Sequence, residues 1–267
     1  MSEILADLAL ATYRTAGSLA APLVDLALRR RERAGKEDPA RRDERRGRAS
    51  RVRPAGFLVW LHAASVGEMM AAMGLIERLA ATGAAVLLTT GTVTSAEIAA
   101  TRLPAGAFHQ YVPVDVAGWV GRFLDHWRPD LAVFVESEIW PATIHALAAR
   151  GVPQVLVNAR ISERSARRWK RLDGLPRALF GRLALSLAQS EADGARLFAL
   201  GAPRVVVTGN LKFDGRPLPV DEVELARLGA AIDGRPTWVA ASTHAGEEAI
   251  TAAAHRRAAE RLPGLLT

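Results

Sequence analysis

Short apolar runs alternate with longer amphipathic stretches along the middle of the chain. The first runs lack polar alternation, which is typical of strands buried on both faces, and lie at residues 57–61, 85–89, 131–135 and 154–157. A further strand and helix pattern covers residues 185–200 and leads to a run at 204–208. Strands separated by helix-length segments predict a parallel sheet covered on both faces. Ligands of such sheets bind at the carboxyl ends of the strands, where we expect the functional residues.

The pattern changes after residue 212. Residues 213–222 contain Gly215, Pro217 and Pro219 without an apolar period, as in an interdomain linker. A predicted strand at 237–241 and a helix beginning near Ala245 then open a second domain. We therefore expect one Rossmann-like domain at residues 54–212, a linker at 213–222 and the truncated start of a similar domain at 223–267.

The two predicted domains open with related sequences. Residues 60–68 read WLHAASVGE and residues 238–247 read WVAASTHAGE, each a strand, a turn of small residues and a Gly-Glu pair that enters a helix. Two such domains would bind substrates in the cleft between them. Coincidence is the alternative, because small residues are common at turns between strands and helices.

The N-terminal stretch is rich in Leu and Ala and carries a narrow polar stripe. On a helical wheel, the polar residues fall within about 40° of one another; they are Asp7, Arg14, Ser18 and Asp25. This pattern predicts a membrane-anchor helix at residues 1–30 that lies in the lipid interface. The alternative is an amphipathic helix packed on its own domain.

The net positive charge of the chain is concentrated in one segment. The chain carries +7, and residues 29–53 alone contain twelve Lys or Arg against five acids. The rest of the chain is therefore neutral on balance, and no nucleic-acid partner is expected. We predict that the basic segment at 31–53 faces anionic lipid.

Several classes of site lack their usual signature. The chain has no cysteine, which excludes disulfides and thiolate metal sites. Neither a dinucleotide fingerprint nor a phosphate-binding P-loop is present. The six histidines show no metal-ligand spacing, so no metal and no cofactor are expected, and His62 and His244 are interpreted as hydrogen-bonding or donor-contacting residues.

The first candidate site is the turn HAASVGE at residues 62–68. Ser65 is placed to cap a helix, Gly67 allows close approach of a ligand to the backbone, and Glu68 falls in the first helical turn. The helix dipole favours an ionised Glu68, which can act as a general base for a hydroxyl group. On local grounds Glu68 can equally be a simple first-turn acid.

Two acids follow the predicted strand at 131–135. Glu136 and Glu138, in VFVESEIWP, lie on the same face while the chain remains extended, and Pro141 suits the start of the next helix. They can orient a substrate or stabilise a transition state. The alternative assigns them to helix capping and a surface ion pair.

Two cationic candidates follow later strands. Arg160 opens the basic segment NARISERSARRWKR, which suits a phosphorylated or acidic ligand or forms a solvated helix face. Lys212, in GNLKFD, lies where the linker begins and can balance developing negative charge. A solvent-exposed linker lysine is the alternative for Lys212.

The ordered set of motifs resembles the 3-deoxy-D-manno-octulosonic acid (Kdo) transferase family. The motifs are HAASVGE, ESEIWP, NARISERS, QSEADGARLFALGA, GNLKFD and STHAGEE, preceded by an N-terminal helix and GKEDP. The resemblance runs through essentially the whole chain. It implies a two-domain, GT-B-type α/β fold and an enzyme at the cytoplasmic face of the cell inner membrane.

The resemblance also implies a reaction and roles for residues. Members transfer Kdo from CMP-Kdo to a lipid A precursor (lipid IVA) with inversion. By motif, Glu68 is the proton acceptor, Glu138 and Lys212 stabilise the transition state, and Ser65, Gly67 and Arg160 bind substrate. Ser242, Thr243 and His244 begin the donor-binding side.

The chain departs from the family pattern at its C-terminal end. The later Pro-Arg, Gly-Gly-Ser and Asn-x-x-Glu segments, which contact CMP in the family, have no counterpart here. The chain alone is therefore expected to show weak or no transfer. Two other hypotheses stay open: another GT-B nucleotide-sugar enzyme or epimerase, and a non-catalytic, membrane-docked lipid-binding module.

Overall fold

The computed structural model describes residues 2–172, 174–214 and 220–267. The chain divides into two compact units, Met1–Arg216 and Pro217–Thr267. The division falls within the expected linker 213–222, of which residues 215–219 lie outside the described part. The candidate site lies in the first unit.

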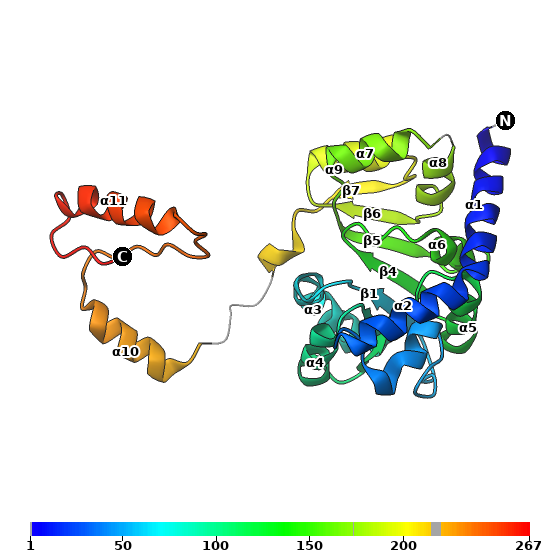
Figure 1. Ribbon diagram of the computed structural model, residues 1–267, viewed down its shortest axis with the longest axis horizontal. Coiled ribbons are helices and arrows are strands. Elements are labelled where there is room, and N and C mark those ends of the chain that lie inside the picture. The colour runs from blue at the N-terminus through cyan, green and yellow to red at the C-terminus, as the bar shows by residue number, and fades with distance from the viewer. Residues whose placement is uncertain (1, 173, 215–219) are drawn as a thin grey trace. The chain divides into compact units, whose positions relative to one another are not determined.

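The first unit is built on a seven-stranded sheet in the order β3-β2-β1-β4-β5-β6-β7, and every neighbouring pair is parallel (Figure 1). This confirms the predicted parallel α/β fold. The strands are β1 (Leu58–His62), β2 (Ala85–Thr90), β3 (Ala107–Tyr111), β4 (Leu131–Val135), β5 (Gln154–Ala159), β6 (Leu185–Ala188) and β7 (Val205–Val207).

One strand, β3, was not predicted from the sequence. It lies at the edge of the sheet and pairs with β2 alone. Its sequence AFHQY contains a buried glutamine, Gln110, whose side-chain oxygen accepts a hydrogen bond from Trp127 Nε1 at 2.9 Å. A polar residue whose oxygen is paired with a distant indole interrupts the apolar run, so the local pattern does not indicate a buried strand.

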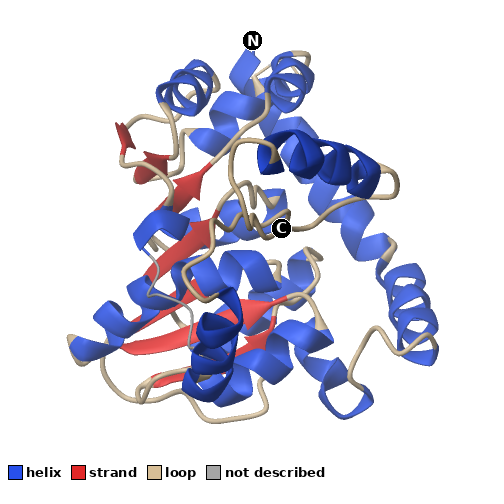
Figure 2. Cartoon of the chain, turned by 90° about the vertical axis from the view of Figure 1, so that its left-hand side faces the viewer, coloured by secondary structure: helices blue, strands red, loops and turns tan. Residues whose placement is uncertain are grey.

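Helices cover both faces of the sheet (Figures 1 and 2). They are α3 (Val66–Ala81), α4 (Val93–Arg102), α5 (Ala117–Trp127), α6 (Pro141–Ala148), α7 (Glu163–Lys170), α8 (Leu175–Phe180) and α9 (Glu191–Ala199). Side chains of β1 alternate between two cores: Leu58 and Trp60 pack with α5 and α6, whereas Val59 and Leu61 pack with α3 and α4. Burial on both faces explains why the sequence of β1 is a continuous apolar run.

The N-terminal region forms two helices, α1 (Ser2–Leu19) and α2 (Ala21–Arg33), where one was expected. Pro22 lies in the first turn of α2 and has no N–H to continue the hydrogen-bond ladder of α1. Among the described helices, none is both long and apolar enough to cross a bilayer.

Part of the polar stripe of α1 and α2 contacts the rest of the protein, although Asp7 and Ser18 remain exposed. Arg14 contacts His145 of α6, Asp25 pairs with Arg46, and Asp7 Oδ1 lies 4.0 Å from Arg182. Large apolar side chains point outward instead: Leu19 is 79% exposed and Leu23 is 71% exposed. The helices pack on their own domain through the buried apolar residues Ala6, Leu10 and Leu28 together with these polar contacts, and they leave other large apolar side chains uncovered.

The basic segment 31–53 is folded rather than extended toward a partner. It contains a 3-10 helix, η1 (Pro39–Arg46), and most of its cations form ion pairs within the chain. Arg31 and Arg45 pair with buried Glu37, and Arg41 pairs with buried Glu44. The acids interspersed in the segment therefore neutralise part of its positive charge, and the expectation that it faces anionic lipid stays a prediction.

The second unit contains the helices α10 (Glu222–Ile232) and α11 (Glu247–Ala259). The strand expected at 237–241 is absent from its described residues, where Thr237 forms only an isolated bridge with Leu266. None of the described residues at 220–267 is buried. A parallel strand needs neighbouring strands and a covering core. The described residues of this unit provide neither, so residues 237–241 do not form a strand despite their apolar sequence.

Asp115 fastens α1 to the start of α6. Its carboxylate accepts hydrogen bonds from Ala142 N, Thr143 N, Thr143 Oγ1 and Tyr13 Oη at 2.6 to 3.1 Å. Asp115→Ala leaves these donors without an acceptor in a buried place, and we expect it to lower the free energy of unfolding by about 3 kcal/mol. Urea titration of the folded chain measures this. Tyr13→Phe removes only the contact to α1 and should cost less than half as much; equal losses would contradict the assignment.

Candidate functional site

The loops that follow β1, β4 and β5 meet at the carboxyl edge of the sheet. His62, the last residue of β1, stands beside Phe134 of the neighbouring strand β4, and β5 follows on the other side of β4. The helix that carries Glu68 and the loop that carries Glu136 and Glu138 are thereby brought together, as expected for a parallel sheet.

Glu68 is held by a capping box at the start of α3. Ser65 is the N-cap, and its Oγ accepts from Glu68 N at 3.3 Å. In return, Glu68 Oε2 accepts from Ala64 N at 2.8 Å and Glu68 Oε1 accepts from Ser65 Oγ at 3.0 Å. This reciprocal arrangement fixes the position of the carboxylate. The first-turn placement that the sequence predicts is therefore correct.

Burial has the largest effect on the pKa of Glu68. The half-buried carboxylate loses hydration, and this raises its pKa above the ordinary glutamate value. The negative charges of Glu138 and Glu136 raise the pKa further, while the hydrogen bonds from Ala64 and Ser65 oppose the rise. A carboxylate with a raised pKa is a stronger base than an ordinary glutamate, which suits proton abstraction.

The pKa of Glu138 is shifted in the opposite direction from that of Glu68. Its Oε2 accepts from Trp140 Nε1 at 2.5 Å and lies 3.5 Å from His62 Nε2. Burial alone would raise its pKa, but the His62 contact and the Trp140 hydrogen bond outweigh burial and lower the pKa of Glu138. Two neighbouring carboxylates whose environments shift their pKa values apart are suited to different roles.

His62 is a buried link between Glu138 and the sheet. Its Nδ1 lies 3.0 Å from both the carbonyl oxygen and Oγ1 of Thr89. Thr89 Oγ1 also accepts from Trp60 Nε1 at 2.8 Å, so the threonine joins His62 to the core. The other ring nitrogen, Nε2, lies on the side of the Glu138 carboxylate. The hydrogen-bonding role predicted for His62 matches this, whereas Thr89 and Trp60 gave no sequence signal.

Lys212 joins the cluster from the end of the first unit. Its Nζ lies 3.5 Å from Glu136 Oε1, and it belongs to a short 3-10 helix, η2 (Leu211–Asp214). Buried Asn158, at the end of β5, fixes this helix because its Oδ1 accepts from Leu211 N at 3.0 Å. Lys212 is therefore an ion-paired residue at the sheet edge. Sequence analysis did not identify Asn158, since its role depends on a contact across 53 residues.

The remaining candidates of the first unit lie around this cluster. Ser65 and Gly67 are exposed in the turn before Glu68. A Cβ at Gly67 would lie 4.0 Å from Ser65 Oγ, so the chain's own packing does not require glycine there. Arg160 is exposed, and its carbonyl oxygen accepts a hydrogen bond from Ser137 Oγ, which ties the β5 loop to the β4 loop.

The candidate donor residues belong to the second unit. Thr243 Oγ1 donates to Glu248 Oε1 at 2.9 Å, and His244 N donates to Glu247 Oε2 at 2.8 Å. These contacts lie within that unit and hold the turn before α11. Within the described ranges, no group of three or more His, Asp or Glu side chains is placed to hold a metal ion.

The structure resembles sugar-nucleotide enzymes in its fold. The crystal structure of UDP-GlcNAc 2-epimerase from Neisseria meningitidis, bound to UDP-GlcNAc, superposes with a TM-score of 0.53 at 14% identity. The match covers 78% of this chain and 64% of that chain. At this identity the likeness concerns the Rossmann-like fold alone.

Proteins related in sequence are more similar to this chain than the structural match is. The chain is 38% identical over 218 residues to 3-deoxy-D-manno-octulosonic acid transferase of Rickettsia bellii, covering 81% of this chain and 52% of the relative. It is 34% identical to the probable mitochondrial 3-deoxy-D-manno-octulosonic acid transferase of Arabidopsis thaliana, covering 94% and 58%. The Haemophilus influenzae transferase is 35% identical, over 82% and 52%. The chain thus spans about half the length of these relatives.

A family model identifies the same domain. The model described as 3-deoxy-D-manno-octulosonic-acid transferase (kdotransferase) matches residues 40–215, which contain Glu68, Glu138 and Lys212. The match takes in the whole sheet and all the loops that form the cluster. The chain therefore belongs to the Kdo transferase family.

Proposed function

We propose that this chain supplies the acceptor-binding half of an inverting glycosyltransferase that moves Kdo from CMP-Kdo to a lipid A precursor. The observation that carries the proposal is Glu68: a half-buried carboxylate with a raised pKa, fixed by a capping box at the carboxyl edge of the sheet. Membership of the Kdo transferase family supports the choice of donor and acceptor.

In the proposed reaction Glu68 takes the proton of an acceptor hydroxyl. The hydroxyl oxygen then forms a bond to the anomeric carbon of Kdo, while the bond from that carbon to the CMP phosphate breaks and CMP leaves with the electron pair. A single displacement inverts the anomeric configuration and needs no covalent enzyme intermediate. Glu68 must be ionised to act, and its raised pKa makes it a better base once it is.

Glu138 and Lys212 serve the same step by charge. Contact with His62 lowers the pKa of Glu138 despite its burial, so Glu138 remains anionic and can stabilise the positive charge that develops on the sugar ring. Lys212, paired with Glu136, offers a cation to the departing phosphate. In this proposal Ser65, Gly67 and Arg160 contact the substrate, and Ser242, Thr243 and His244 begin the donor site of a second, GT-B-type domain.

Location at a membrane is part of the proposal. Leu19, Leu23 and other large apolar residues of α1 and α2 are exposed, while Arg14 and Asp25 of the polar stripe contact the protein. An apolar face of this kind suits an interfacial position, with acceptor lipid delivered from the cytoplasmic face of the inner membrane. Arg30, Arg33 and Lys36, for which the structure gives no ion pair among the described residues, are available to anionic lipid.

The test uses membranes that contain the full-length gene product, because the chain spans about half of its relatives. CMP-Kdo and a tetraacylated lipid A precursor should yield a Kdo-bearing lipid. Turnover of UDP-GlcNAc in place of CMP-Kdo would favour an epimerase, the activity of the structural neighbour from Neisseria meningitidis. Acceptor binding without any turnover would favour a lipid-binding module.

Lys212→Ala should lower kcat by about 100-fold, the typical loss when one charged stabilising group is removed. Lys212→Arg keeps the charge next to Glu136 and should retain a larger share of the activity. Initial rates of Kdo transfer at saturating acceptor measure both variants. Equal activity of the alanine variant and the wild type would show that Lys212 has no role in the reaction.

A further inference from the structure

We propose that a groove between α1, the start of α2 and the loop before α6 binds one acyl chain of the acceptor lipid. The inference rests on the proposed function and names a substrate contact beyond the reacting groups. It commits to the acceptor, rather than bulk phospholipid, because Trp140, one of the residues that line the groove, donates a hydrogen bond to Glu138.

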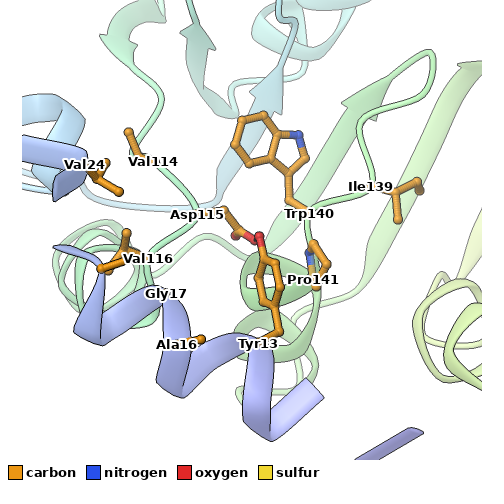
Figure 3. A pocket seen from close by; sticks show the side chains of 11 residues that line it. Tyr13, Ala16, Gly17, Val24, Val114, Asp115, Val116, Ile139, Trp140 and Pro141 are labelled. Carbon is orange, nitrogen blue, oxygen red and sulfur yellow. The ribbon is translucent and has the colours of Figure 1, made fainter. Parts of the chain in front are cut away.

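The groove has the size and lining of a chain-binding slot. It measures about 520 Å³. Small residues of α1 form one wall, and Val116, Ile139 and Pro141 contribute to the other (Figure 3). A Cβ placed on Gly17 would meet no atom within 4 Å, so the space above this residue is open. Small side chains on a helix next to apolar partners leave room for a flexible hydrocarbon.

The polar groups in the groove are already satisfied. Figure 3 shows the hydroxyl of Tyr13 directed at the carboxylate of Asp115, and the two oxygens are 3.1 Å apart. The remaining capacity of Asp115 is taken by Ala142 N and by the backbone and hydroxyl of Thr143. The lining therefore offers a ligand apolar contact rather than hydrogen bonds, which selects hydrocarbon over a sugar or nucleotide.

Trp140 connects the groove to the candidate site. Its ring lines the groove, and its Nε1 donates to Glu138 Oε2 at 2.5 Å. The same ring packs edge-on against His62, with ring centroids 5.8 Å apart. A chain that fills the groove thus contacts the indole that positions Glu138. An acceptor held here would have its headgroup beside the residues proposed to act on it.

Positive charge lies alongside the groove. His145 is one helical turn beyond Pro141 on α6, and its two ring nitrogens lie 2.8 Å from Arg14 Nη1 and 2.7 Å from Arg182 Nη1. The carboxylate paired with this cluster is Asp7, which is 73% exposed and 4.0 Å from Arg182 Nη2. Two guanidinium groups that share one imidazole leave donors available for an anion. A phosphorylated, acylated lipid matches both features.

Filling the groove tests the inference by kinetics. Gly17→Leu places a branched side chain in the open space and should raise KM for a tetraacylated acceptor at least about tenfold, since each excluded methylene weakens apolar binding. The value of kcat should change less than threefold, because the reacting groups are untouched. Gly17→Ala should have a smaller effect in the same direction. Thr15→Leu, on the opposite side of α1, is the matched control and should leave KM unchanged.

A second readout does not depend on transfer. Bromine quenches tryptophan fluorescence on contact, so 9,10-dibromostearate added to the intact protein should quench a saturable part of the emission. Gly17→Leu should abolish the saturable quenching because it fills the groove. Trp140→Phe should also abolish it, because the tryptophan that is quenched is then absent. The Thr15→Leu variant should behave as wild type.

The two readouts separate the inference from the function on which it rests. Retained Kdo transfer with an unchanged KM in Gly17→Leu would overturn the acyl-chain site alone. Saturable quenching that Gly17→Leu abolishes, in a protein without Kdo transfer, would support the groove and overturn the proposed reaction. Quenching that is equal in wild type and Gly17→Leu would overturn the inference whatever the transfer result.

Discussion

Replacing Glu68 by glutamine should lower kcat for Kdo transfer by about 100- to 10,000-fold, the usual contribution of a general base. Glutamine has nearly the same shape, and its side-chain oxygen can still accept the hydrogen bond from Ala64 N. It cannot accept the proton of the acceptor hydroxyl. Single-turnover transfer with saturating CMP-Kdo and acceptor measures the chemical step.

The same variant should remain folded. Burial raises the pKa of Glu68, so the carboxyl stabilises the folded state fully below the unfolded-state pKa, and this stabilisation is lost as pH rises through the folded-state pKa. At neutral pH glutamine therefore removes no favourable charge. Glu191→Gln, at the first turn of α9, is the matched control and should keep full activity. Loss of activity in both variants would point to a general effect of helix-start acids.

Trp60→Ala should lower the free energy of unfolding by about 3 to 5 kcal/mol, the cost of removing a large aromatic side chain from a core. Trp60 is 1% exposed and packs against Phe123 and Phe134, with ring centroids 4.7 and 5.5 Å away. Its loss also removes the hydrogen bond that orients Thr89 next to His62. Urea unfolding followed by circular dichroism gives the difference.

A tryptophan outside the core provides the comparison. Trp238, in the second unit, is 36% exposed, and Trp238→Ala should change the unfolding of the first unit by less than about 0.5 kcal/mol. If Trp60→Ala unfolds at the same urea concentration as the wild type, the packing of β1 against the core does not make the large contribution to stability that we expect.

The sheet could be predicted because a strand that is buried on both faces is a continuous apolar run in the sequence. β1 and β4 are apolar at nearly every position, since alternate side chains enter different cores. β3 was missed because buried Gln110 interrupts its apolar pattern, and the oxygen of this side chain is paired with Trp127 of α5, which is distant in sequence. The strand expected at residues 237–241 failed for the opposite reason: its sequence suits a strand, but pairing partners are absent from the described residues of its unit.

Much of the candidate site could also be predicted. Ser65 and Glu68 have the three-residue spacing of a capping box, which is a local signal. Thr89 and Asn158 act through contacts with residues 27 and 53 positions away, and neither carries a local pattern. The polar stripe of α1 could be predicted, but the contacts of Asp7 with Arg182 and of Arg14 with His145 become evident only in the folded chain.

The pH dependence of kcat for wild type and Glu68→Gln tests the central claim most directly. The ionised carboxylate is the active form, so the wild-type rate should fall on the acid side with an apparent pKa above the ordinary glutamate value. The residual rate of Glu68→Gln should lack this acid limb. An unchanged acid limb in the glutamine variant would show that another group accepts the proton, and the role proposed for Glu68 would be wrong.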